Sequence, residues 1–334
     1  MNRLTPTLGV ALAAALVLAG CSAPSESAVE GELSIVASTD VYASIAAAVA
    51  GDRAVVSAII DDPATDPHSY EATARDRLAL TEADIVIGNG GGYDPFVDAL
   101  LGDGYDGIVL VAVELSGLLP EDYENHDHDH ADDDHDHAEE GHDRDHSEEG
   151  HDHEGHDHVE GFNEHVWYHL ETAKGLASAL AAALSDLDPA GATTYSSNSD
   201  VFSLEVDALI ERAHELEHEL GHLHVVLTEP APQYLAELLG AHNITPEAFT
   251  SAVEAGFDVP ANALLEVLRL VESGDADLVL WNEQTSGPQI ERVVAAARDA
   301  GVPVVTISET LPPGTDYLSW MGSNLDAIAG VLSP

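Results

Sequence analysis

The chain has little cysteine, few basic residues and only one long apolar run, and each shortage excludes a class of protein. Cys21 is the single cysteine among 334 residues, so no disulfide can form within the chain. Ten Lys and Arg stand against 62 Asp and Glu, for a formal charge of −52. Phosphate backbones are bound by clustered Lys and Arg, which excludes nucleic acid as a partner. No second apolar run follows the N-terminal one, which excludes an integral membrane domain.

The N-terminal apolar run, residues 8–19, is shorter than the roughly 20 residues that a membrane-spanning helix needs. It follows a short basic start and ends in Leu18-Ala19-Gly20-Cys21. This segment resembles a lipoprotein signal peptide, with residues 1–20 removed and lipid attached to Cys21. Residues 21–32, rich in Ser, Glu and small residues, then predict a flexible tether. We therefore expect a lipid-anchored protein at the extracytoplasmic face of the cell membrane.

In the rest of the chain, short apolar runs that predict buried strands alternate with helical patterns. In the first half, strands are predicted at 33–37, 54–60, 84–88 and 108–113, and helices at 42–50, 71–80 and 95–101. Further on, strands are predicted at 224–228, 278–281 and 302–307, and helices at 166–187, 190–220, 233–239, 261–273, 289–300 and 325–332. Alternation at this spacing is typical of an α/β fold.

The fold class that this pattern predicts is α/β, with two lobes that each hold a mainly parallel sheet flanked by helices. One long rigid helix is expected to join them. The N-terminal lobe is assigned to residues 33–188, including a disordered His- and Asp-rich loop at 121–160; the connecting helix is assigned to 189–221 and the C-terminal lobe to 222–334. Ligands of open α/β sheets bind outside the carboxyl ends of the strands, so site residues are expected in those loops.

Between Asn125 and Val159 the chain carries eleven of its nineteen histidines, together with fifteen Asp or Glu and one Arg. Imidazole nitrogens beside carboxylate oxygens bind borderline cations such as zinc. A run with almost nothing apolar cannot offset its ordering entropy by burial, so it has no fixed geometry. We expect it to collect several ions weakly beside a stronger site. The auxiliary metal ligands predicted here are His126, His128, His130, His135, His137, His151, His153, His156 and His158.

Three loops carry metal-ligand residue types in distinctive settings, and at these loops the chain resembles a known family. Asp66-Pro67-His68-Ser69-Tyr70-Glu71 follows one predicted strand, Glu164-His165-Val166-Trp167 opens a helix, and Thr228-Glu229 ends another strand, with Tyr234 nearby. These motifs are similar to Asp-Pro-His-x-Tyr-Glu, Pro-His-x-Trp and Ser-Glu or Ser-His in the cluster A-I solute-binding proteins. That family delivers zinc or manganese to bacterial ABC importers, and the resemblance covers nearly the whole mature chain.

The resemblance implies that His68, His165 and Glu229 are metal ligands that converge between the lobes. Two imidazoles and one carboxylate suit zinc and manganese alike. It further implies that the protein binds its ion without catalysis, and that its partners are an ABC permease with its ATPase. We expect a monomer. A His- and Asp-rich insertion before the second motif is common among zinc-type members, which favours Zn(II) as the transported ion.

The fourth ligand is where the chain departs from the manganese-type members. These place an Asp in the loop after the strand equivalent to 278–281, but residues 282–288 contain no Asp. Either Glu283 or a water molecule is expected to complete the shell. Zinc-type members more often have His where this chain has Glu229. The zinc prediction therefore depends on the His-rich run.

A competing motif, His218-Glu219-Leu220-Gly221-His222, matches the H-E-x-x-H pattern of zinc metalloproteases. Such enzymes hold both histidines on one continuous helix, whereas Gly221 predicts a helix end before His222. With His214, these histidines recur at four-residue spacing on one polar face. We expect a solvated face or a weak auxiliary metal site, and no enzyme.

The chain is thus interpreted as an extracytoplasmic solute-binding protein that captures Zn(II) with high affinity and delivers it to a membrane permease. A Mn(II)-specific protein of the same family is the alternative. A surface metal store or adhesin, or an H-E-x-x-H zinc protease, fits the pattern less well.

Overall fold

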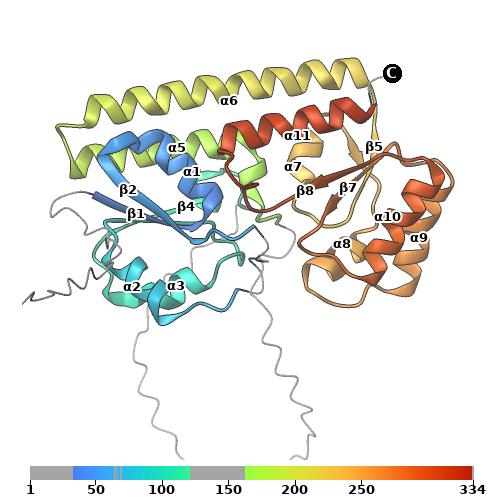
Figure 1. Cartoon of the computed structure of the whole chain (residues 1–334), viewed down its shortest axis with the longest axis horizontal. Coiled ribbons are helices and arrows are strands. Elements are labelled where there is room, and N and C mark those ends of the chain that lie inside the picture. Colours follow the sequence, from blue (N-terminus) through green and yellow to red (C-terminus); the bar gives the residue numbers. More distant parts are fainter. Residues whose placement is uncertain (1–32, 64, 66, 68–69, 121–161, 333–334) are drawn as a thin grey trace, which may run out of the picture. The chain divides into compact units, whose positions relative to one another are not determined.

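The computed structural model describes residues 33–120 and 162–332, with the exception of residues 64, 66, 68 and 69 (Figure 1). The predicted signal peptide, Cys21 and the tether lie outside these residues. So do His68 and the nine predicted auxiliary histidines of the 121–160 loop.

The first sheet consists of four parallel strands in the order β2-β1-β3-β4. Its strands are β1 (Leu33–Thr39), β2 (Ala54–Ile60), β3 (Ile85–Gly88) and β4 (Ile108–Val111). The helical segments between and after them are α1 (Asp40–Ala50), η1 (Gly51–Arg53), α2 (Ala74–Glu82), α3 (Phe96–Leu101), η3 (Gly102–Gly104) and α4 (Ala112–Leu115). Ile35 packs in the core that contains α1, whereas Val36 packs with Leu80 of α2 and Val97 of α3. Both faces are covered, which explains the continuous apolar runs of these strands.

The second sheet repeats the same plan with the order β6-β5-β7-β8, again all parallel. Its strands are β5 (His224–Leu227), β6 (His242–Asn243), β7 (Leu278–Asn282) and β8 (Val304–Ile307). Its helices are α7 (Gln233–Leu238), α8 (Glu247–Glu254), α9 (Ala261–Glu272), α10 (Pro288–Ala300) and α11 (Tyr317–Leu332). Val226 and Val279 face a core formed with α8, α9 and α10, while Leu227 and Leu280 face the core that contains α11.

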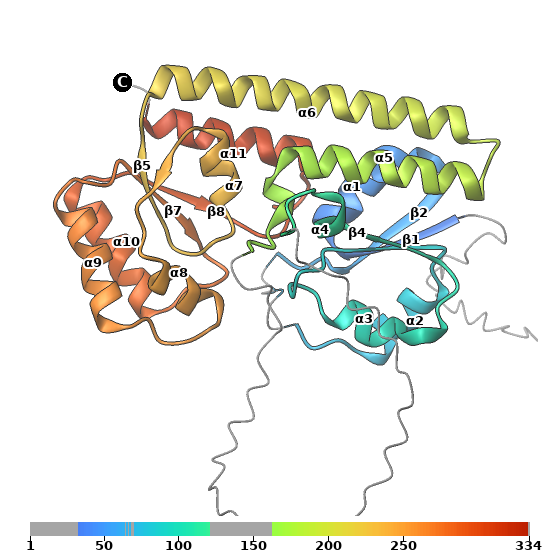
Figure 2. The same ribbon diagram turned by 180° about the vertical axis from the view of Figure 1, so that it is seen from behind.

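Two long helices, α5 (Leu170–Leu187) and α6 (Ala192–Leu220), follow the short turn η4 (Val166–Tyr168). Helix α6 packs along α5 and α1 on the side of the first sheet and against α11 and α7 on the side of the second, as both ribbon views show (Figures 1 and 2). Its 29 residues give a length of about 43 Å at 1.5 Å per residue. The α/β fold with two parallel sheets and one long connecting helix is therefore confirmed.

The structure differs from the sequence expectation at a few elements, and each difference has a local cause. Helix α2 begins at Ala74 because Thr73 and Asp76 form a reciprocal capping box there. The predicted strand 108–113 ends at Val111, and its last two residues open α4. Strand β6 and helix α8 were not expected, because a two-residue strand and a two-turn helix are too short to show a hydrophobic period.

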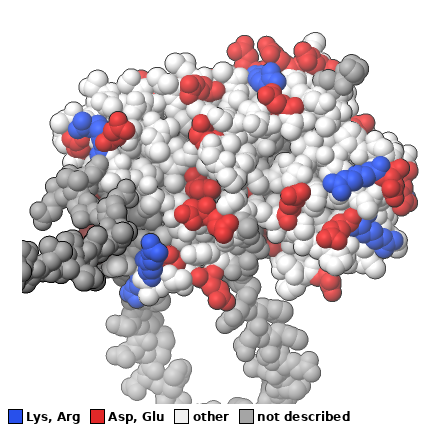
Figure 3. Space-filling view, viewed as in Figure 1, with Lys and Arg blue, Asp and Glu red and all other residues white. Residues whose placement is uncertain are grey.

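The helices of the described residues include none with both the length and the apolar character that a bilayer crossing requires. Acidic side chains are spread over the surface seen in Figure 3, with Lys and Arg at few positions, as the composition requires.

Candidate metal centre

His165 lies at the entrance to η4 and is fully buried. Its backbone NH and its Nδ1 both contact Asn163 Oδ1, at 3.1 and 2.7 Å. The amide nitrogen of Asn163 donates to Pro230 O at 3.1 Å, so the oxygen of the amide is the atom that faces the ring. That oxygen accepts a hydrogen bond, so Nδ1 carries the proton and, in the neutral ring, Nε2 keeps its lone pair. This is the arrangement in which metal-binding histidines are usually held.

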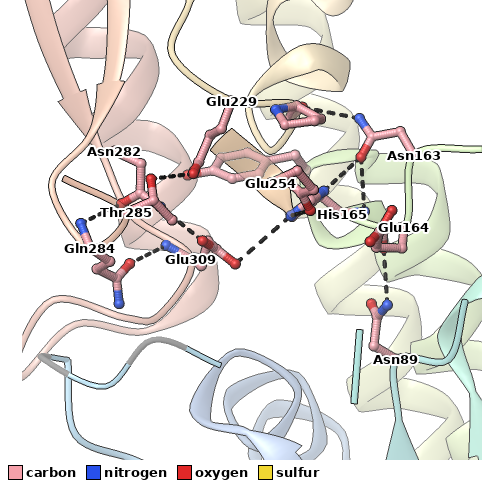
Figure 4. Close-up of polar contacts among 12 residues, drawn as sticks. Asn89, Asn163, Glu164, His165, Glu229, Glu254, Asn282, Gln284, Thr285 and Glu309 are labelled. Carbon is pink, nitrogen blue, oxygen red and sulfur yellow. Dashed lines mark hydrogen bonds and ion pairs between the residues drawn. The ribbon is translucent and has the colours of Figure 1, made fainter. Parts of the chain in front are cut away.

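Within the described residues, carboxylate oxygens of two glutamates lie close to Nε2 of His165 (Figure 4). Glu254 Oε1 lies 3.3 Å away and Glu309 Oε2 lies 3.8 Å away. Glu254 is the last residue of α8, and Glu309 is the second residue after β8. A nitrogen lone pair and carboxylate oxygens repel one another at such separations, so a positive charge, either a proton or a metal ion, belongs between them.

Glu229, two residues beyond β5, is buried with 1% of its surface exposed. Its Oε2 accepts a hydrogen bond from Thr285 Oγ1. Its Oε1 accepts none within the described part of the chain, although it is buried. Burial, and then the negative charges of Glu309 and Glu254, hold the pKa of Glu229 well above its ordinary value. A buried carboxylate oxygen without a hydrogen-bond donor, beside two further carboxylates, is suited to bind a cation.

Glu309 is fixed by two neutral amides, one at the end of β7 and one in the loop that follows it. Asn282 Nδ2 donates to Glu309 Oε1 at 2.8 Å, and the backbone NH of Glu309 donates to Gln284 Oε1 at 2.7 Å. The Nε2 of Gln284 donates to Thr310 Oγ1 at 2.9 Å and to the backbone oxygens of Pro63 and Thr65 at 3.1 and 3.2 Å. Gln284 thus ties the loop after β2 of the first sheet to the loop after β8 of the second.

Glu164 precedes His165 and adds a fourth buried carboxylate. Glu164, His165 and Glu254 each offer one ligand atom within 4.8 Å of the others, and they form the one such His and acidic group in the described residues. The backbone oxygen of Glu164 accepts a hydrogen bond from Asn89 Nδ2 at 3.0 Å. Gly91, at φ +68°, approaches so closely that a Cβ there would lie 3.1 Å from the Glu164 Cβ. The glycine run after β3 therefore lets this loop pack against the centre.

Three tyrosine hydroxyls hold the segment around His165 against the second sheet and α11. Tyr168 donates to Ser308 O at 2.5 Å, and Tyr234 donates to Asn163 O at 2.7 Å. Tyr317 donates to Trp167 O at 2.7 Å. The rings of Tyr93 and Trp167 pack edge-on against the imidazole. These contacts fix the ring before any ion is bound.

The sequence-predicted site residues have different outcomes. His165 and Glu229 are buried in the same centre, where both neighbour Glu254 and Glu309. His68 lies outside the described residues. Glu283 has an exposed side chain, next to Asn282 and Gln284, which contact Glu309.

Glu309 and Glu254 were not among the predicted site residues. Glu309 follows a predicted strand by two residues, so the rule that directs attention to the carboxyl ends of strands would have found it. Glu254 had no such signal, because α8 was not predicted.

The histidines of the competing protease motif are on the surface. His214 and His218 lie exposed on α6, and His222 lies beyond the end of the helix, after Gly221 at φ +73°. The two histidines of H-E-x-x-H are therefore not on one continuous helix, as the sequence analysis expected.

A comparison with protein families shows which family the chain belongs to. The family model described as ZnuA, zinc-uptake complex component A, periplasmic, matches residues 35–331. The chain belongs to this family. It is a metal-binding solute-binding protein of an ABC importer and not an enzyme.

The relatives of this chain are named for different metals. The zinc-binding lipoprotein AdcA of Streptococcus pneumoniae is 26% identical over 325 residues, which are 94% of this chain and 58% of AdcA. The manganese ABC transporter substrate-binding lipoprotein PsaA of Streptococcus mitis is 24% identical over 97% of both chains. Among solved structures, the periplasmic zinc binding protein TroA from Treponema pallidum has a TM-score of 0.64 at 18% identity, over 91% of this chain and 100% of TroA. This last likeness establishes the fold.

Proposed function

We propose that this chain captures Zn(II) outside the cytoplasm and hands it to the permease and ATPase of an ABC importer. His165, Glu229 and Glu309 are proposed as ligands, together with His68 from the first motif. In this set two imidazoles and two carboxylates come from four separate loops. Four donors of these types match the tetrahedral shell that zinc prefers in proteins.

One observation carries the proposal. The hydrogen bond to Asn163 leaves the Nε2 lone pair of His165 directed at carboxylate oxygens, with distances of 3.3 Å to Glu254 and 3.8 Å to Glu309. Two donors about 2.1 Å from one tetrahedral ion lie about 3.4 Å apart, so this spacing suits two ligands of a single ion. The unsatisfied Oε1 of Glu229 supports the same interpretation.

Mn(II) is the second candidate, and the described donors favour it more than the sequence did. Oxygen ligands predominate around His165, and carboxylate-rich sets suit manganese. The preference for zinc still depends on the His-rich run at 121–160, which lies outside the described residues.

The place of action is proposed from the N-terminus. Residues 1–20 would direct export and Cys21 would carry the lipid, with residues 21–32 as the tether. AdcA and PsaA are named as lipoproteins, which supports this part of the proposal.

Calorimetric titration of the metal-stripped protein with Zn(II) and with Mn(II) tests the proposal. One tight site is expected, along with weaker zinc sites from the His-rich run. His165→Ala is expected to lower the affinity of the tight site at least about 100-fold, since it removes a ligand outright.

His214→Ala is the matched control, because His214 lies exposed on α6. It should bind as the unaltered chain does. Tight binding that survives His165→Ala would overturn the proposed centre, and a chain that binds neither ion tightly would overturn the proposed function.

A further inference from the structure

Helix α8 brings a carboxylate to the centre from a direction that the other donors do not use. His165 and Glu229 stand in the motif loops, and Glu309 follows β8, but Glu254 is the last residue of a helix. Its Oε1 is the carboxylate oxygen closer to His165 Nε2, at 3.3 Å against 3.8 Å for Glu309. Its side chain is only 12% exposed.

The position of Glu254 is unfavourable for a negative charge unless a cation is near. The carbonyl end of a helix carries a partial negative charge, which disfavours a carboxylate in the last turn. Glu229 and Glu309 add two more buried carboxylates, and the charge of Glu254 acts on Glu229. A surface acidic residue at a helix end would turn toward solvent, whereas this one faces the imidazole.

A second observation points to a ligand at the same place. Glu229 Oε1 is buried and accepts no hydrogen bond from the residues that the structure describes. Since Glu229 and Glu254 interact through their charges, a single ion between them and His165 could bind all three groups.

We propose that Glu254 is a metal ligand supplied by α8, and that it is the residue that makes the centre hold Mn(II) tightly in addition to Zn(II). This inference rests on the proposed function. Under the proposed function, four ligands already complete a tetrahedral zinc shell, and Glu254 is an additional donor. A fifth donor, and an oxygen, serves an ion that takes more ligands and prefers oxygen, as manganese does.

Glu254→Gln and Glu254→Ala test the inference in the full chain, with Zn(II) and Mn(II) affinities measured by competition against a chelator. Both variants are expected to lower Mn(II) affinity about tenfold or more and Zn(II) affinity less than about threefold, so that the ratio of the two changes. Glu254→Gln keeps the shape of the side chain, which separates loss of a ligand from loss of packing. Glu247→Gln, on the exposed first turn of the same helix, is the control and should leave both affinities unchanged.

The Co(II) absorption spectrum is a further test, because replacing a residue that only supports the fold would not change it. Four-coordinate cobalt absorbs far more strongly in the visible range than five- or six-coordinate cobalt. Loss of Glu254 is therefore expected to intensify the Co(II) spectrum. An unchanged spectrum together with an unchanged ratio of affinities would overturn the role of Glu254 and leave the proposed function standing. Failure of the unaltered chain to bind either ion would overturn the function itself.

Discussion

The segment that follows the first sheet brings an imidazole, the amide that orients it and one carboxylate, Glu164, to the candidate centre, whereas the elements of the second sheet bring three carboxylates. His165 is oriented by Asn163, and the preceding residue is held by Asn89. Glu229 and Glu309 come from the loops after β5 and β8, and Glu254 ends α8. One side therefore offers a directed lone pair and the other offers most of the negative charge. An ion satisfies both at once, and each side alone is incomplete.

The largest expected effect comes from removing charge on the carboxylate side. Glu229→Gln should lower the affinity for the first metal ion about 100-fold, because a ligand is lost. The same change should raise the free energy of unfolding of the metal-free protein by about 1 kcal/mol or more, since buried like charges no longer repel. Titration calorimetry and denaturant unfolding measure the two effects. If the variant binds metal normally, or is less stable without metal, the carboxylates of the second sheet do not supply the charge that binds the ion.

The same carboxylate predicts how stability depends on pH. The pKa of Glu229 is raised in the folded state above its ordinary value of 4.5, so the folded protein binds more protons than the unfolded chain. Asp40, whose pKa burial raises to about 6, acts in the same direction. Their contributions make the metal-free protein lose stability as pH rises from about 4.5 toward neutrality. Thermal unfolding at pH 5 and pH 7 should show this loss without metal and a smaller one with saturating Zn(II).

The next effect is expected from the imidazole side. Asn163→Ala removes the acceptor that keeps the proton of His165 on Nδ1, while all four carboxylates of the centre remain. Metal affinity should fall about 10- to 100-fold. Asn262→Ala, exposed on α9, is the control. Competition titration with a chelator measures both, and equal affinities would show that the orientation of the ring does not matter.

A smaller effect is expected from the residue that connects the two sides. Gln284→Ala removes the contacts to Glu309, Pro63 and Thr65 but no proposed ligand. Metal should dissociate faster, with an affinity loss of about tenfold or less. Stopped-flow transfer to a chelator measures the rate. Glu283→Ala is the informative neighbour: a loss larger than that of Gln284→Ala would support the sequence prediction that Glu283 is a ligand.

The smallest effect on the first ion is expected from the His-rich run. Deletion of residues 126–158 should change the number of bound zinc ions and the selectivity far more than it changes the affinity of the tight site, which should stay within about threefold. Calorimetry of the intact and the shortened chain separates these quantities. A large loss of first-ion affinity would place the principal site in the run.

The helices and strands that could be predicted from the sequence are those that are long or that form clear apolar runs. The strands β1, β3, β5 and β7 are buried on both faces, so their apolar runs stand out in the sequence. The long helix α6 showed a clear end at Gly221. By contrast, α8 lies between Pro246 and Gly256 and is too short to show a period, so its last residue, Glu254, could not be expected at the centre.

The fourth ligand proposed from the structure, Glu309, differs from the sequence prediction, Glu283, for another reason. Glu283 lies in the loop after 278–281, whereas the carboxylate 3.8 Å from His165 Nε2 belongs to Glu309, which follows β8. Both loops leave neighbouring strands of one sheet at the same edge, so strand order alone does not choose between them. Side-chain direction decides, and it depends on the amides of Asn282 and Gln284.

Helix α6 constrains how the ion can enter and leave. It runs unbroken along α1 and α11, so rotating one sheet away from the other would bend 29 residues or separate packed helices. Exchange of the ion should therefore proceed through shifts of short loops and the end of α8, at small amplitude. The permease would then distinguish the metal-bound from the metal-free protein by the local surface near Gln284 and Glu254, and not by the overall size or shape of the molecule. Small-angle scattering profiles of the two forms should nearly superimpose.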